Sequence, residues 1–193
     1  MALHELDALD RAVDEFRAHL AAVRTEQWTN PTPCTNWDVR YLVAHVVGGN
    51  RFASMVLDRR PAQDALTVVM GTQQLGADPL VDFDESTTRQ RAGFRRVGAL
   101  EALVSHPLGD LSGERFLTMR VFDVAVHAWD LATALGREST IDDALAEHVL
   151  RTVLREVPGM GFGIEPCGEV RPDAPPLERL LDLSGRCIGR APA

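Results

Sequence analysis

The stretch GERFLTMRVFDVAVHAWDLATALG, residues 113–136, is predicted to form one long helix that ends at Gly136. Glycine is common just past the end of a helix because it readily adopts the left-handed conformation needed there. Asp123 and His127 lie four residues apart, so their side chains project from one face and can share a ligand. A carboxylate oxygen and an imidazole nitrogen suit zinc and similar divalent metals. The same spacing also fits the solvated face of an amphipathic helix that binds nothing.

His45 is the third candidate metal ligand. It lies in the apolar segment LVAHVV, residues 42–47, which is an inward setting for an ionisable group. Gly49 follows one turn later, and a glycine inside a helix costs about 1 kcal/mol relative to alanine. We expect the missing side chain to leave room beside His45 for a ligand or metal. A core histidine that donates to a backbone carbonyl is the alternative interpretation.

Four further helices are predicted around residues 113–136. Apolar residues at helical spacing, together with breakers such as the prolines of NPTPC, set their limits. Two of them begin with a capping box, formed by Thr35 with Asp38 and by Thr140 with Asp143. The predicted ranges are Leu3–Val23, Thr35–Leu57, Ser86–Leu103 and Ile141–Val157.

The connection between the second and third helices is predicted to be long. Residues 58–84 show little pattern, and a structureless loop of that length is unusual, so we expect a short helix within it. A long crossover allows the helices that it joins to run parallel. Nothing in the sequence predicts a sheet. The predicted class is all-α: residues 1–157 form a metal-binding bundle of five helices, and residues 158–193 an extended tail that packs on it, with a turn or two at LERLLDL (residues 177–183).

The composition excludes several classes of protein. A net charge of -8 over 193 residues opposes nucleic-acid binding, and no apolar stretch is long enough to span a membrane. The acidic N-terminus, MALHELDALDR, does not resemble a signal peptide. Cys34, Cys167 and Cys187 are odd in number and form no CxxC pair, so neither a disulfide framework nor a cysteine zinc site is expected. A cytoplasmic location is predicted. All basic residues are arginine, which indicates a GC-rich bacterial genome.

Several residues near the candidate ligands are expected to have structural roles. Arg120 lies three residues before Asp123 and can pair with it when no metal is bound. Asp130 is interpreted as a charge on the helix surface, with contact to a metal ligand as the alternative, and Cys34 as a small residue of the PTPC turn. Tryptophans 28, 37 and 129 are interpreted as packing anchors. The other histidines are expected at the surface: His4, His19, His106 and His148.

Three motifs resemble one known family. The segments WTNPTPCTNWDVRYLVAHVVGGNRF (residues 28–52) and VFDVAVHAWDLATALG (residues 121–136) are similar to parts of the DinB-like, mycothiol-dependent maleylpyruvate isomerase N-terminal family. The ending DAPPLERLLDLSGR (residues 173–186) resembles the tail of its short, metal-binding actinobacterial branch. The resemblance implies a DinB-like four-helix bundle with one divalent metal on His45, Asp123 and His127. Zinc is expected first, with nickel or another metal as the alternative. The isomerase has a glutamate where this chain has Asp123.

The resemblance also implies a class of chemistry. Three protein ligands leave a coordination position open, which is typical of a catalytic metal. We expect a small thiol, mycothiol, to be activated there as a thiolate that attacks an electrophilic substrate. The alternatives are a non-enzymatic metal-binding bundle that acts as a sensor or interaction scaffold, and a metal-activated hydrolase. Isomerase activity is not expected, because the isomerase's second domain supplies catalytic residues and has no counterpart in this sequence. A homodimer is kept as an alternative to a monomer.

Overall fold

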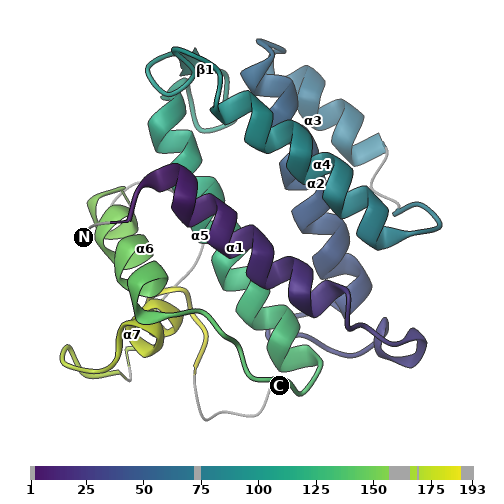
Figure 1. Cartoon of the computed structure of the whole chain (residues 1–193), viewed down its shortest axis with the longest axis vertical. Helices are drawn as coiled ribbons and strands as arrows, with labels where there is room; N and C mark the ends of the chain where they lie inside the picture. Colours follow the sequence, from purple (N-terminus) through teal and green to yellow (C-terminus); the bar gives the residue numbers. More distant parts are fainter. Residues whose placement is uncertain (1–2, 72–74, 157–165, 169, 188–193) are drawn as a thin grey trace.

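The computed structural model describes residues 3–71, 75–156, 166–168 and 170–187. Four long helices form its bundle (Figure 1): α1 (Glu5–Leu20), α2 (Val39–Leu57), α4 (Pro79–Phe94) and α5 (Gly113–Ala134). The shorter helix α3 (Ala62–Gly71) lies in the crossover between α2 and α4, as predicted. Helices α6 (Asp143–Glu156) and α7 (Pro176–Leu183) pack on the side of α1 and α5, away from α3. The predicted all-α class is confirmed.

Contacts along the helices fix their directions. The contact points advance together along α2 and α4: Asn50 donates to Thr87, and further along both helices Arg96, just after α4, donates to the Leu57 carbonyl. The predicted parallel arrangement across the long crossover is therefore confirmed. Helices α1 and α5 also run parallel, since Thr118 donates to Glu5 while Arg137, just beyond α5, reaches His19. Each parallel pair packs against the other in antiparallel fashion.

Helix α2 begins at Val39, later than predicted. The Asp38 carboxylate accepts a hydrogen bond from the Tyr41 amide (2.8 Å), so Asp38 itself is the N-cap. Thr35 lies in the preceding turn, and Asn36 has a positive φ of 64° that ends any helical path through it. Asparagine tolerates this left-handed conformation better than most residues do. The predicted capping box of Thr35 with Asp38 is wrong, because Thr35 lies in the turn before the helix and Asp38 is itself the N-cap.

Helix α4 also differs from its predicted range of Ser86–Leu103. It begins at Pro79, with the Asp78 carboxylate as N-cap, and ends at Phe94. Proline suits the first helical position, where its missing N–H is not needed. The buried face of α4 carries several polar residues, which hid its apolar periodicity: Ser86, Thr87 and Gln90.

A small sheet precedes α5, although the sequence predicted none. Strand β1 (Leu103–Val104) pairs antiparallel with β2 (Leu111–Ser112). Two-residue strands are too short to show the alternation that identifies a strand in a sequence. The Ser112 hydroxyl then accepts from the Arg115 amide, so the hairpin ends in the N-cap of α5. Helix α5 runs over almost the predicted range, and Gly136 has the expected positive φ of 65°.

The ends of the smaller helices are shifted by a few residues. Helix α1 spans Glu5–Leu20, within the predicted Leu3–Val23. Helix α6 begins at Asp143, and the Leu145 amide donates to the Asp142 carboxylate rather than to Thr140. Its predicted last residue, 157, lies outside the described residues. Helix α7 confirms the turns predicted at LERLLDL. None of the described helices is long and apolar enough to span a membrane.

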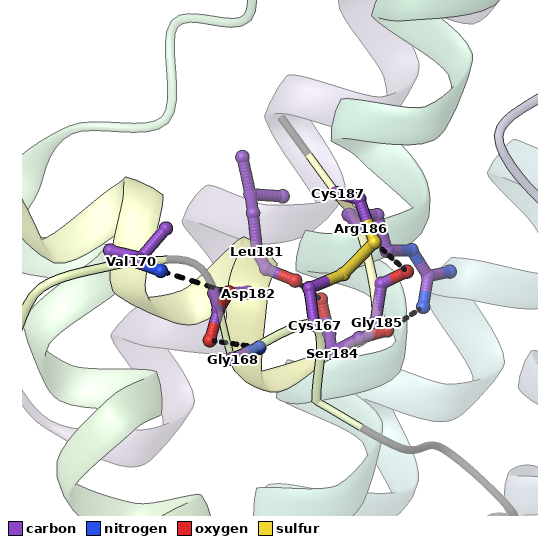
Figure 2. Close-up of a disulfide and its surroundings, with 9 residues drawn as sticks. All are labelled: Cys167, Gly168, Val170, Leu181, Asp182, Ser184, Gly185, Arg186 and Cys187. Carbon is purple, nitrogen blue, oxygen red and sulfur yellow. Dashed lines mark hydrogen bonds between the residues drawn. A yellow bond between two sulfur atoms is a disulfide. The ribbon is translucent and has the colours of Figure 1, made fainter. Parts of the chain in front are cut away.

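Two predictions about cysteine and histidine are wrong. Cys167 and Cys187 form a disulfide across α7 (Figure 2), although neither their number nor their spacing indicated one. His19 and His148 are buried rather than at the surface. His148 Nε2 lies 3.1 Å from a Glu5 carboxylate oxygen, so α6 meets the start of α1 through a polar pair. The disulfide and the contact of His148 with Glu5 each join residues that are distant in the chain.

Glu15 is a buried carboxylate that fastens the segment before α6 to α1. One of its oxygens accepts from the Thr140 amide (2.6 Å) and the Ser139 hydroxyl (3.1 Å), and the other accepts from the Thr140 hydroxyl. His19 Nε2 lies 3.0 Å away. Burial alone would raise the pKa of Glu15, but the hydrogen bonds from Thr140 and His19 outweigh it and lower the pKa.

Replacing Glu15 with Gln is expected to lower the free energy of unfolding at pH 7 by about 2 kcal/mol, because hydrogen bonds to a charged acceptor are weakened. A lowered folded pKa means that this stabilisation is present above the ordinary value of 4.5 and is lost as the pH falls below it. Urea unfolding at a series of pH values should therefore give free energies of unfolding for the parent and E15Q that become equal in acid. The exposed control Glu26→Gln should match the parent, and a constant E15Q difference at every pH would contradict the assignment.

A candidate metal centre between α2 and α5

The three predicted ligands meet where α2 crosses α5. Asp123 Oδ1 lies 3.2 Å from His45 Nε2 and 3.5 Å from His127 Nε2. The ligand atoms of the three side chains all lie within 4.8 Å of one another. Helix α5 places Asp123 and His127 one turn apart, and α2 brings His45 to them from the antiparallel direction. The structure thus brings together every residue that the sequence proposed for this site.

The donor set fits a divalent metal. Zinc bonds of about 2.0–2.1 Å in tetrahedral geometry place neighbouring donor atoms about 3.3 Å apart. The two distances from Asp123 Oδ1, 3.2 and 3.5 Å, lie close to that spacing. Two imidazole nitrogens and one carboxylate oxygen suit zinc and other borderline metals. Without an ion, the same approach lets Asp123 hydrogen-bond to His45.

Arg120 holds the other oxygen of Asp123. Its Nη1 donates to Asp123 Oδ2 at 2.7 Å, which confirms the predicted pairing. The guanidinium is buried; its Nε donates to Gln90 Oε1 and its Nη2 to Asn50 Oδ1, each at 2.9 Å. Because Oδ2 is occupied, Asp123 presents only Oδ1 to the two histidines. A metal at this site would therefore meet one carboxylate oxygen.

Gly49 does not have the role that the sequence suggested. A Cβ at this position would overlap the Arg120 guanidinium, so the space above Gly49 is filled by Arg120 rather than left for a ligand. The glycine is required because α2 must let a charged group of α5 approach its backbone. The prediction of free space beside His45 is wrong, because the Arg120 guanidinium, which is paired with Asp123, fills it.

Asp130 is part of the cluster rather than a surface charge. Its side chain has no exposed surface, and its Oδ2 lies 2.8 Å from His127 Nδ1. Arg186, which follows α7, donates to both Asp130 oxygens, at 3.1 and 2.7 Å. The Cys34 thiol donates to Asp130 Oδ2 at 3.2 Å, so Cys34 is also more than a turn residue. The three-residue spacing of His127 and Asp130 could have indicated their pairing, but nothing local indicated Arg186.

The charges in the cluster perturb one another. Burial would raise the pKa of Asp123, but Arg120 and the two histidines hold it well below its usual range. Burial would lower the pKa of His127, but hydrogen bonds to Asp123 and Asp130 raise it well above the ordinary value. Burial would also raise the pKa of Asp130, but contacts with His127 and Arg186 lower it below its ordinary value. A metal on His127 would therefore displace a bound proton.

Trp37 forms one wall of the site. Its ring centroid lies 4.8 Å from that of His45 and 5.6 Å from that of His127. Tyr41 packs on the same indole at 4.7 Å. Trp37 is a packing residue, as predicted, but what it packs against is the candidate ligands. The His45 side chain is 37% exposed whereas His127 is 10% exposed, so the site opens toward solvent beside His45.

A second group of donors shares His127. Cys34, His127 and Asp130 also place one ligand atom each within 4.8 Å of the others. Both Asp130 oxygens are engaged by Arg186, however, and Oδ2 also contacts His127 Nδ1. A metal there would have to displace a buried ion pair. His45, Asp123 and His127 are therefore the better candidate.

Known proteins are similar to this chain in sequence. A family model described as the mycothiol maleylpyruvate isomerase N-terminal domain matches residues 9–132. An uncharacterized protein of Mycobacterium tuberculosis, found in strains CDC 1551 and H37Rv, is 34% identical over 194 residues, which is 95% of this chain and 98% of that protein.

Two crystal structures have a similar fold. The mycothiol-dependent maleylpyruvate isomerase aligns with a TM-score of 0.60 and 17% identity, over 79% of this chain and 68% of its own. A histidine-to-alanine mutant of it aligns with a TM-score of 0.62 and 16% identity, over 75% of this chain and 65% of that chain. This chain thus spans about two thirds of the length of the isomerase chain. At these identities the likeness concerns the fold.

Gly49→Ala is expected to displace Arg120 from Asp123 and to lower the free energy of unfolding by about 1–3 kcal/mol, the usual cost of overpacking. Urea unfolding at pH 7 measures this difference. Gly71→Ala is the matched control, because a Cβ there meets nothing within 4 Å. It should be neutral or slightly stabilising, since alanine is the better helix former. Equal stability of the parent and G49A would show that Arg120 does not need the space above Gly49.

Proposed function

This chain belongs to the mycothiol maleylpyruvate isomerase N-terminal domain family, and from that premise we propose that it binds one divalent metal, zinc first, through His45, Asp123 and His127 and uses it to activate a small thiol. The observation that carries the proposal is the approach of Asp123 Oδ1 to both histidine Nε2 atoms, at 3.2 and 3.5 Å. The match of the M. tuberculosis relative over nearly its whole length supports a shared fold, and that relative has no assigned activity.

The surrounding residues support metal binding by orienting the ligands. Arg120 occupies Asp123 Oδ2, and Asp130 engages His127 Nδ1, so Asp123 Oδ1 and His127 Nε2 face the same point. Partners of this kind fix the tautomer and orientation of metal-bound histidines. Aspartate is one methylene shorter than the glutamate of the isomerase, yet its Oδ1 reaches both histidines here.

The open side of the site favours a small second ligand. His45 is partly exposed beside the Trp37 ring, so a thiol can enter there without displacing the buried ion pairs. A bound metal would supply a Lewis acid that deprotonates a coordinating thiol. The names of the structural relatives point to mycothiol as that thiol. The reaction class that we propose is conjugation of the intact thiol to an electrophilic small molecule: its sulfur forms the new bond, and the thiol proton passes to the product. The Trp37 indole is the apolar surface beside the site.

Protein purified without chelators is expected to contain about one divalent ion per chain, because the site has three protein ligands. Elemental analysis measures this ratio. Both His45→Ala and His127→Ala should lower the metal content sharply. His4→Asn is the matched control, since His4 is an exposed histidine whose N-cap role asparagine can take over. Parent-like metal content in H127A would place the metal elsewhere.

Mycothiol is expected to raise the thermal midpoint of the metal-loaded protein and to leave the chelated protein unchanged. A ligand stabilises the state to which it binds, by about 2.7 kcal/mol at a hundredfold excess over its dissociation constant. Differential scanning fluorimetry with and without a chelator measures the shift. Free serine, which has no thiol, is added instead of mycothiol as the control for non-specific effects. The same shift in the chelated protein would show that mycothiol binds without the metal. No shift in the metal-loaded protein would favour a non-enzymatic bundle.

A further inference from the structure

Arg186 connects the C-terminal segment to the candidate site. Its Nε and Nη2 donate to the two oxygens of Asp130, and Nη2 also donates to Cys34 Sγ at 3.4 Å. The side chain is 12% exposed although it lies near the end of the described chain. Asp130 has no exposed surface, so Arg186 supplies a compensating charge to a fully buried carboxylate. Removing that partner leaves the buried Asp130 carboxylate with only His127 and the Cys34 thiol beside it.

The disulfide holds Arg186 from its C-terminal side. Cys187 is the next residue, and its bond to Cys167 ties it back across α7 (Figure 2). The Arg186 amide donates to the Leu181 carbonyl, and Arg186 Nη1 donates to the Ser184 carbonyl. The Cys167 amide in turn donates to the Asp182 carbonyl. Arg186 is therefore held between the end of α7 and the disulfide.

A cavity gives small molecules access to the disulfide. It has a volume of about 640 Å³ and is lined by residues from three parts of the chain, among them Pro31, Trp129, Arg186 and Cys187. Both cysteines are partly exposed. Thiol–disulfide exchange requires that a thiolate reach one sulfur of the bond. The cavity is large enough to admit a low-molecular-weight thiol beside Cys187.

We propose that the Cys167–Cys187 disulfide is an exchange site for low-molecular-weight thiols, and that its reduction releases Arg186 from Asp130. A thiolate attacks one sulfur, which gives a mixed disulfide and frees the other cysteine as a thiolate. A second thiol then resolves the mixed disulfide. In total, two small thiols are oxidised to their disulfide and the protein gains two thiols. Exposed disulfides are the labile, regulatory kind, and both cysteines of this one are partly exposed.

Release of Arg186 is expected to weaken the candidate metal site, a consequence that rests on the proposed function. With Arg186 gone, the buried Asp130 carboxylate must find water or another donor, and it no longer holds His127 Nδ1 in one position. Loss of such a partner of a histidine ligand typically costs 10–100-fold in metal affinity. The disulfide would in this way couple the thiol supply around the protein to the state of its metal site.

The first test addresses the exchange and the release without any metal. Folded, metal-free protein is treated with 2-mercaptoethanol and followed by mass spectrometry, and Arg186 is then labelled with phenylglyoxal. We expect reduction without denaturant and a severalfold faster labelling of Arg186 in the reduced protein and in the Cys167→Ser/Cys187→Ser double variant. Arg24 and Arg171, with side chains 66% and 81% exposed, are internal controls that should label equally in both states. A disulfide that resists reduction until urea is added, or unchanged Arg186 labelling, would overturn the proposal.

The second test measures the dissociation constant for zinc by competition with a chromophoric chelator. The double variant is used because free cysteines 167 and 187 would themselves bind zinc. We expect its zinc affinity to be about tenfold weaker than that of the disulfide form. Arg186→Gln in the disulfide form should show the same loss, and Arg171→Gln none. If neither form binds zinc, the proposed function fails while the labelling test still decides the release of Arg186. If both bind equally, the coupling is refuted and the metal site stands.

Discussion

The burial of one guanidinium constrains the whole bundle. Arg120 lies between three helices, and a charge in that position is tolerated only when its donors are satisfied. It donates to Gln90 of α4, Asn50 of α2 and Asp123 of its own helix. These bonds tie α2 and α4 to α5 at one register, because each donor and acceptor must stay within hydrogen-bond distance. The same guanidinium requires Gly49 on α2 and sets the orientation of Asp123.

The polar network continues from this point to the end of the described chain. Asp123 contacts His127, His127 contacts Asp130, and Asp130 binds Arg186. Positive and negative groups alternate along it, so each charge lies beside a compensating one. A network of this kind holds its side chains in single positions before any ligand arrives. It also means that a change at the tail, where Arg186 meets the disulfide, reaches the candidate ligands through only two intervening contacts.

The relatives define what a test on this chain would establish. The M. tuberculosis protein matches over 95% of this chain, whereas the isomerase structures align over 75–79% of it. A metal or thiol requirement measured here would therefore apply first to the short relatives, whose length this chain shares. The isomerase shares the arrangement of helices with this chain. At 16–17% identity, the comparison does not extend to its reaction.

Features that depend on neighbouring residues could be predicted from the sequence. Helical periodicity identified α1, α2 and α5, Gly136 marked the end of α5, and the four-residue spacing of Asp123 and His127 placed them on one face. His45 was found from its apolar surroundings within α2. These inferences succeeded because the geometry of one helix is fixed over a few residues. The predicted start of α2 failed for the opposite reason, since the turn before Asp38 is stabilised by contacts outside the helix.

The partners of the buried charges follow from the folded chain and not from local sequence. Asp130 was assigned to the surface because its partner Arg186 lies 56 residues away. The sequence suggests that Gly49 leaves room for a ligand, because Arg120, which fills that room, comes from another helix. It gives no sign of the Cys167–Cys187 disulfide, because only the fold around α7 brings the two cysteines together. Local spacing cannot report these contacts, since a buried charge takes whichever partner the closed chain places beside it.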